Sequence, residues 1–324
     1  MESSVGPVTL EGPGWVSGFA FRSMHLSEAL GALSRFDVEL LSDQQNQDAK
    51  KILGQPLTIC LDLADAGKRY FNGYVTEFSA RGQVGENFLY GLVLRPWLWL
   101  LSRTSNCRVF QNQSIPDIVK KIFRDRGFTD FSESLTGIYD PREYVVQYRE
   151  SDQHFVNRLL EEAGIYYFFK HEADKHTLVL CDSPSAHDPT PFYDSLPYRP
   201  PARSRREHMD SVDGWEITQI VESGAYALKD YDFEKPTAPL LADKTLDPGH
   251  DQGSYEQFDF PGGYTEMSPA KLKAAMRLEE VRATWTRAHG EGNTPGLSVG
   301  CLFTLADFPI DEYNRDYLVV SMEA

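Results

Sequence analysis

The sequence has few cysteines, and they lie far apart. Cys60, Cys107, Cys181 and Cys301 are the only ones, with no C-x-x-C pair and no histidine at zinc-finger spacing. Cys60 and Cys181 stand in apolar, strand-like runs, where a thiol packs as a small hydrophobic group. We therefore expect four reduced, buried thiols in a reducing compartment. We expect no metal site.

A long apolar run and an excess of basic residues are also missing. Glu2 stands where a signal peptide would carry basic residues, and the apolar run near Leu98 is interrupted by Arg95 and Pro96. We therefore expect no signal peptide and no membrane span. The formal net charge of -16 repels phosphate backbones and anionic headgroups. Nucleic acid and membrane surfaces are poor candidate partners.

Alternating apolar and polar residues predict strands through the first hundred residues. The runs Phe71–Phe78 and Phe88–Leu94 flank Gly82 and Gly85, which predicts an antiparallel strand pair. A length of 324 residues is enough for more than one domain, because a domain typically takes roughly 100–200 residues. We expect several domains.

Two amphipathic helices are predicted in the middle of the chain. Apolar residues fall on one helical face from Ile115 to Phe123, with Ser114 as N-cap and Gly127 at the stop. A second helix is capped by Ser151 and ends at Gly164. Both helices need a sheet against which their apolar faces can pack.

A hairpin, a linker and a third helix complete the pattern. Ile165–Phe169 and Thr177–Leu180 flank a polar turn and should pair under the two helices. Six prolines between Asp182 and Asp210 oppose regular structure and predict a domain boundary. A helix should begin at Ser268–Pro269. Final strands should cover 301–305 and 317–321.

Gly296-Leu297-Ser298-Val299-Gly300 matches the G-x-S-x-G motif of hydrolases. In those enzymes the serine lies on a strained turn between a strand and a helix. Here the motif runs into the strand-like residues 301–305, and no histidine follows it. We interpret the motif as a turn before a strand.

Other titratable residues also have structural explanations. His171 and His176, with Glu172 and Asp174 beside them, could collect a metal, but a solvated hairpin turn lacks the hydrogen bonds that fix imidazole ligands. We expect that turn to be solvated.

The first turn of the second helix holds Asp152 and His154, and Asp152 should complement the helix dipole. Glu161 and Glu162 point to different sides of the helix, which indicates a solvated face and not a catalytic pair. We expect the basic cluster Arg203, Arg205 and Arg206 to keep the linker exposed to water. We expect no catalytic residue and no cofactor.

Several long blocks of the chain follow one another in an order typical of one family. They are Arg35–Ser42, Leu53–Pro56, Arg69–Phe78, Leu94–Leu101, Arg142–Asp152, Phe155–Phe169, Phe260–Tyr264 and Asn314–Ser321. Together they span nearly the whole chain and resemble the hub region of the VgrG family, the spike proteins of type VI secretion.

The resemblance implies a β-rich α+β fold like the hub of contractile-tailed phages. Two related, tube-forming β-barrel domains and a small α/β insert would assemble as a hollow homotrimer with pseudo-sixfold symmetry. The expected parts are a first barrel (1–104), the insert (105–182), a Pro-rich linker (183–210) and a second barrel (211–324). Strand edges left unpaired in one subunit would then find partners in its neighbours.

The implied function is mechanical. The trimer would cap the hexameric tube protein Hcp and carry a puncturing needle, with secreted effectors or their adaptors. It would assemble in the cytoplasm and leave through the type VI apparatus. The family continues into an oligonucleotide-binding-type barrel and a β-helical needle, which this chain lacks, so we expect a shortened form or a split gene product.

Two alternatives remain open at this point. The chain could be the baseplate hub of a contractile phage or a phage-like tail. A different class of function is a hydrolase of cell-wall sugar or ester, suggested by Ser298 and the many acidic residues.

Overall fold

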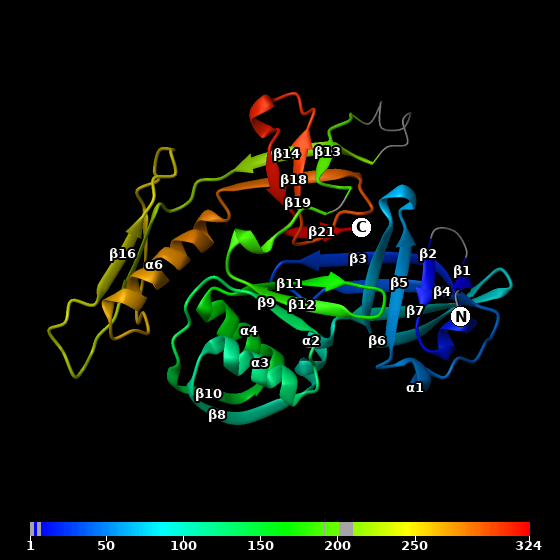
Figure 1. Ribbon diagram of the computed structural model, residues 1–324, viewed down its shortest axis with the longest axis horizontal. Helices are drawn as coiled ribbons and strands as arrows, with labels where there is room; N and C mark the ends of the chain where they lie inside the picture. Colours follow the sequence, from blue (N-terminus) through cyan, green and yellow to red (C-terminus); the bar gives the residue numbers. More distant parts are fainter. Residues whose placement is uncertain (1–2, 5–7, 191, 201–209) are drawn as a thin grey trace. The chain divides into compact units, whose positions relative to one another are not determined.

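The computed structural model describes residues 3–4, 8–190, 192–200 and 210–324 (Figure 1). The chain divides into a larger unit, Met1–Leu196 with Thr294–Ala324, and a smaller unit, Pro197–Asn293. The two units divide the chain differently from the predicted domain ranges. Residues 294–324 group with the first part of the chain because β21 (Ser321–Glu323) pairs with β3 (Ala20–Ala29).

An eight-stranded antiparallel sheet forms the first part of the larger unit. Its order is β1 (Ser3–Ser4), β2 (Val8–Glu11), β5 (Pro56–Asp62), β6 (Lys68–Val84), β7 (Asn87–Arg95), β4 (Arg35–Ser42), β3 and β21. Strands β1 and β2 also contact β3, so the sheet curls around its own core. Phe36, Leu40 and Leu57 are fully buried there. The predicted pair 71–78 and 88–94 is confirmed as β6 and β7.

Short helices flank this sheet. They are α1 (Ala49–Ile52), α2 (Trp97–Leu100) and the 3₁₀ turns Gly14–Gly18, Ala64–Ala66 and Leu101–Arg103. Trp97 and Leu98 of α2 are buried in the next layer.

The predicted insert is an α+β layer within the larger unit. Helices α3 (Ile115–Asp125) and α4 (Asp152–Ala163) share one core with a two-stranded ribbon and a three-stranded sheet (Figure 1). The ribbon is β8 (Ser105–Gln113) with β10 (Arg142–Ser151), and the sheet has the order β11 (Tyr166–His171), β12 (His176–Cys181), β9 (Phe131–Ser134).

The helix ends lie where the capping pattern predicted them. The Ser114 hydroxyl accepts a hydrogen bond from the Asp117 amide at 3.3 Å, and the Ser151 hydroxyl accepts one from the His154 amide at 3.1 Å. Gly164 closes α4 in the left-handed conformation, with φ of 68°, which glycine adopts without strain.

Of the two final strands predicted, 301–305 is confirmed as β19 and 317–321 is divided. β19 (Leu302–Ala306) pairs with β20 (Asp316–Leu318), and β13 (Ser195–Pro197) joins its other side. After β20 the chain crosses to the first sheet, where the Leu30 amide donates a hydrogen bond to the Val320 carbonyl at 2.9 Å. The predicted strand 317–321 is therefore split between two sheets.

The smaller unit contains a ribbon and a two-layer α/β structure. The ribbon pairs β14 (Ser211–Gln219) with β18 (Thr286–Asn293). A sheet of order β16 (Leu241–Thr245), β15 (Ala225–Lys229), β17 (Glu256–Asp259) carries α6 (Met267–Arg282) on one face. The helix predicted from Ser268–Pro269 is confirmed as α6. None of the helices that the structure describes is both long enough and apolar enough to cross a membrane.

Candidate functional site

The β14–β18 ribbon is a candidate assembly surface. Every residue of β18 is exposed, and only Ser211 and Val212 of β14 are buried. Apart from a bridge between Tyr198 and Val212, neither outer edge has a strand partner among the described residues. An isolated two-stranded ribbon is marginal in water, and a free strand edge is a template for pairing with another chain.

A second exposed surface lies on the outer face of the β8–β10 ribbon. Tyr144, Val146 and Tyr148 are directly opposite Gln111, Val109 and Cys107 in the antiparallel register. Val109, Tyr144 and Tyr148 are each more than half exposed. The prediction of four buried thiols was wrong for two of them: Cys301 is only partly buried, and Cys107 is exposed as well. Its side chain alternates to the face opposite the core residue Phe110.

A cavity of about 440 Å³ lies within the larger unit. It is formed by residues of β3, β6 and β11 and by the loops around 188–193 and 296–301. Its lining includes Glu28, Arg69, His171 and Ser298. Because these residue types also occur in hydrolase active sites, their geometry decides whether Ser298 could act as a nucleophile.

His171, the histidine that lines this cavity, is not placed as a general base for Ser298. His171 accepts a hydrogen bond at Nδ1 from the Asn72 amide, at 3.1 Å, and its Nε2 lies 3.4 Å from Glu28 Oε1. Both ring nitrogens are thus directed at groups other than the serine, whose Oγ lies 3.1 Å from Cys301 Sγ. A serine nucleophile requires a base within hydrogen-bond reach. The motif leads through turns into β19, as predicted.

The carboxylate beside His171 belongs to a buried ion pair. Glu28 Oε2 lies 3.6 Å from Arg69 Nη2, and Arg69 Nη1 donates to the Pro295 carbonyl at 2.8 Å. Burial raises the pKa of Glu28, but contacts with His171, Arg69 and Ser34 outweigh it and leave the pKa below its usual value. The charged residues of the cavity therefore fasten segment 294–301 to β3 and β6.

The turn residues Glu172–Lys175 are exposed as predicted, but the expectation that the histidines flanking them are solvated was wrong. His176 is 2% exposed. Its Nε2 accepts from the Trp97 amide at 2.8 Å and its Nδ1 donates to Asn72 Oδ1 at 2.7 Å, an arrangement for the neutral ring. Burial, with a smaller contribution from His171, lowers the pKa of His176 to about 3. The hairpin packs against β6, which no spacing in the sequence indicates.

Asp152 also has a different role from the one predicted. Ser151 caps α4, whereas the Asp152 carboxylate is fully buried. It accepts hydrogen bonds from Thr104, Arg108, Arg126 and Gln147 at 3.0, 2.5, 2.6 and 2.9 Å. Burial raises the pKa of Asp152, but these bonds outweigh it and the pKa is lowered. The carboxylate joins the ribbon, both helices and the preceding turn.

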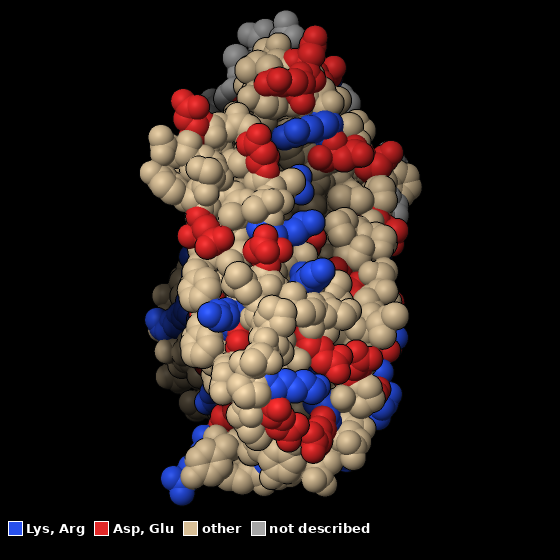
Figure 2. All heavy atoms as spheres, turned by 90° about the vertical axis from the view of Figure 1, so that its left-hand side faces the viewer, with Lys and Arg blue, Asp and Glu red and all other residues tan. Residues whose placement is uncertain are grey.

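The remaining candidate residues form no reactive cluster. Glu161 is exposed, and Glu162 lies 3.1 Å from Arg142. Arg203, Arg205 and Arg206 lie outside the described residues. Within the described ranges, no three His, Cys, Asp or Glu side chains gather as metal ligands. Acidic and basic side chains are interspersed on the face drawn in Figure 2.

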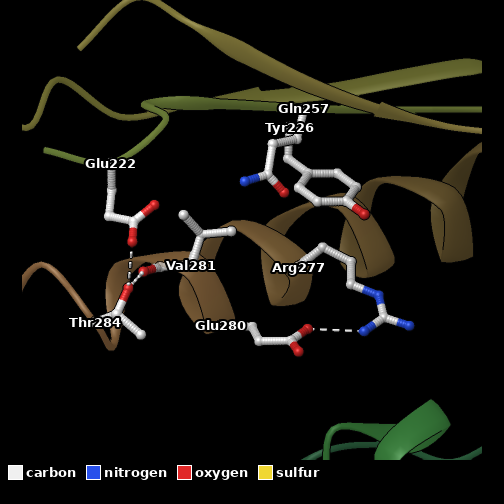
Figure 3. A pocket seen from close by; sticks show the side chains of 7 residues that line it. All are labelled: Glu222, Tyr226, Gln257, Arg277, Glu280, Val281 and Thr284. Carbon is white, nitrogen blue, oxygen red and sulfur yellow. Dashed lines mark hydrogen bonds and ion pairs between the residues drawn. The ribbon is translucent and has the colours of Figure 1, made fainter. Parts of the chain in front are cut away.

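A smaller pocket of about 360 Å³ lies between α6 and the sheet of the smaller unit (Figure 3). Thr284 donates to Glu222 at 3.1 Å, and Arg277 pairs with Glu280 at 2.7 Å. These polar groups are paired with one another, and nothing in their arrangement indicates a reaction.

The sequence matches the phage tail baseplate hub (GPD) family over residues 27–324. The chain belongs to this family. The fold agrees with that of an Escherichia coli type VI secretion component, c3393, which is described as similar to the T4 tail proteins gp27 and gp5. The TM-score is 0.72 and the identity 21%, and the match covers 97% of this chain and 72% of that one. A 43 kDa prophage MuSo2 tail protein from Shewanella oneidensis matches with a TM-score of 0.64 and 15% identity, covering 98% and 93%.

Among baseplate hub proteins, the chain is similar to curated type VI spike proteins. It is 40% identical to VgrG1b of Pseudomonas aeruginosa over 98% of its length and 32% identical to VgrG3 of Vibrio cholerae over 88%. The predicted resemblance to VgrG is confirmed, and so is the β-rich, tail-hub type of fold. The chain spans 42% of the length of VgrG1b and 28% of VgrG3.

Proposed function

We propose that this chain is the non-enzymatic base of a type VI secretion spike. Three copies would form a hollow hub that caps the hexameric tube protein Hcp and carries a needle with effectors or their adaptors. The hub would assemble in the cytoplasm and leave through the secretion apparatus. The family match supports a hub of either kind, and the 40% identity to a spike protein supports this function over that of a phage hub.

The observation that carries the proposal is the exposure of β18 along its whole length. Strand edges that are open in one copy can be closed by neighbours around a ring. Pairing between copies would complete the second barrel proposed for 211–324, while the curled sheet would be the first barrel, proposed for 1–104. The insert (105–182) and linker (183–210) would connect them.

The alternative of a hydrolase finds no support at Ser298. Both nitrogens of His171, the histidine that lines the same cavity, are directed elsewhere. If Ser298→Ala abolished a cell-wall or ester hydrolysis measured with the native chain, this part of the proposal would be wrong.

Binding to Hcp tests the proposal. The chain, fused at its C-terminus to an unrelated trimeric coiled coil, is mixed with purified Hcp hexamers and imaged by negative-stain electron microscopy. We expect caps on one end of Hcp rings. The coiled coil fused to an unrelated protein is the control, and the absence of caps with the fused chain would contradict the proposed function.

A further inference from the structure

The sheet of the smaller unit has one covered and one open face. Tyr226 and Leu228 of β15 pack toward α6. Because side chains alternate along a strand, Ala225, Ala227 and Lys229 belong to the opposite face. There Leu241 is 50% exposed and Phe258 57% exposed, so no described element covers these side chains.

Strand register places Leu241 and Phe258 on the same face, on either side of β15. Ala227 is directly opposite both Asp243 of β16 and Phe258 of β17, and Lys229 is opposite Leu241. The small, buried Ala227 therefore lies between a carboxylate and an aromatic ring. Because Ala227 is only 3% exposed, the apolar surface that a partner can reach on this face is that of Leu241 and Phe258.

The charge around this face is predominantly negative. Between residues 229 and 266, acidic residues outnumber the basic residues Lys229, Lys235 and Lys244. Asp243 and Glu256 are exposed on the open face itself. A partner that covers this surface must therefore bring basic side chains to avoid burying unpaired carboxylates.

The edges of the same sheet can take up an extended chain. Among the described residues, β16 and β17 each pair only with β15, so their outer edges are open (Figure 1). An added strand presents alternate side chains to the sheet face, and its backbone pairs with the edge.

We propose that this open face, defined by Leu241, Asp243, Glu256 and Phe258, binds an extended segment of a partner protein that places both apolar and basic residues at the alternate positions facing the sheet. The proposal goes beyond the spike-base function and does not depend on it. The complementary charge favours such a segment over a second copy of this acidic chain.

Peptide binding to the full chain tests this surface. The probe is a fluorescent peptide of about ten residues in which Leu and Arg occupy every second position in turn and Thr fills the positions between them, and binding is measured by anisotropy. We expect Phe258→Ser and Leu241→Ser each to weaken binding at least about tenfold. Asp243→Lys should weaken it as well. Leu272→Ser is the matched control, because Leu272 is exposed on α6, and it should bind like the unaltered chain.

Three outcomes would overturn the proposal. They are no binding of the Arg–Leu peptide, equal binding of a peptide with Glu in place of Arg, and equal loss of binding with Leu272→Ser. Sedimentation is run in parallel. Self-association that is lost in Phe258→Ser, without peptide binding, would identify a second copy as the occupant instead. Circular dichroism melting confirms that each variant folds.

Discussion

At the residue scale, buried polar side chains connect segments that are distant in sequence. Asn72 on β6 receives a hydrogen bond from His176, 104 residues away, and Asp152 receives one from Thr104, 48 residues away. A buried charge or amide must be paired to be stable. These contacts therefore make the insert and the first sheet one unit.

Replacing Asp152 with Asn should destabilise the larger unit. Arg108 and Arg126 would lose their shared carboxylate, and breaking a buried ion pair costs about 3–5 kcal/mol. Because these arginines are 20% and 33% exposed, we expect a loss of about 2–4 kcal/mol in the free energy of unfolding. Urea denaturation measures it. Asp117→Asn is the control, because this carboxylate is 63% exposed, and it should lower the free energy of unfolding by no more than about 1 kcal/mol. Equal losses in the two variants would contradict the role of Asp152.

His176 should make stability depend on pH. Its folded-state pKa of about 3 lies below the usual 6.5, so the unfolded chain takes up a proton below pH 6.5 while the folded ring stays neutral. This contribution to stability is therefore lost progressively as pH falls from 6.5 toward 3.

The test compares urea midpoints of variants across that range. His176→Gln should be less stable at pH 7, because it loses the imidazole contacts, but should show a shallower decline on acidification. His25→Gln removes an exposed ring on β3 and should keep the original slope. An unchanged slope in His176→Gln would show that another group causes the decline.

At the element scale, the sequence predicts what local contacts determine. Helices α3 and α4 were predicted because Ser114, Ser151 and Gly164 set their ends within a few residues. The burial of His176 was missed because it depends on Asn72, and the split between β20 and β21 was missed because it depends on the edge of β3. The exposure of β18 also has no local signal, since partners outside the chain would decide it.

The β14–β18 ribbon gives a prediction at this scale. A Cβ on Gly292 would lie 2.3 Å from the Ser211 carbonyl oxygen and 2.9 Å from Val212 Cα, so Gly292→Val should disrupt the ribbon. We expect loss of assembly while the larger unit keeps its melting temperature. Ala288→Val is the matched control, because Ala288 is exposed on the same strand opposite Ile217 and valine favours strands. Assembly that survives Gly292→Val would exclude the ribbon as the interface.

At the scale of the whole molecule, the account assigns function to surfaces and not to a reactive site. The cavity gathers Glu28, Arg69 and His171, yet each is held by a structural contact. The exposed ribbon is unusual for a chain that acts alone, because free strand edges invite pairing. In a ring of copies, neighbouring chains would pair these strand edges, and the role of the chain would be mechanical.

Sedimentation velocity of the full chain over rising concentration tests this claim most directly. The account predicts that monomers give way to a trimer with the unaltered chain and with Ala288→Val, and that Gly292→Val stays monomeric. A monomer at every concentration, or a trimer that forms equally well with Gly292→Val, would contradict it.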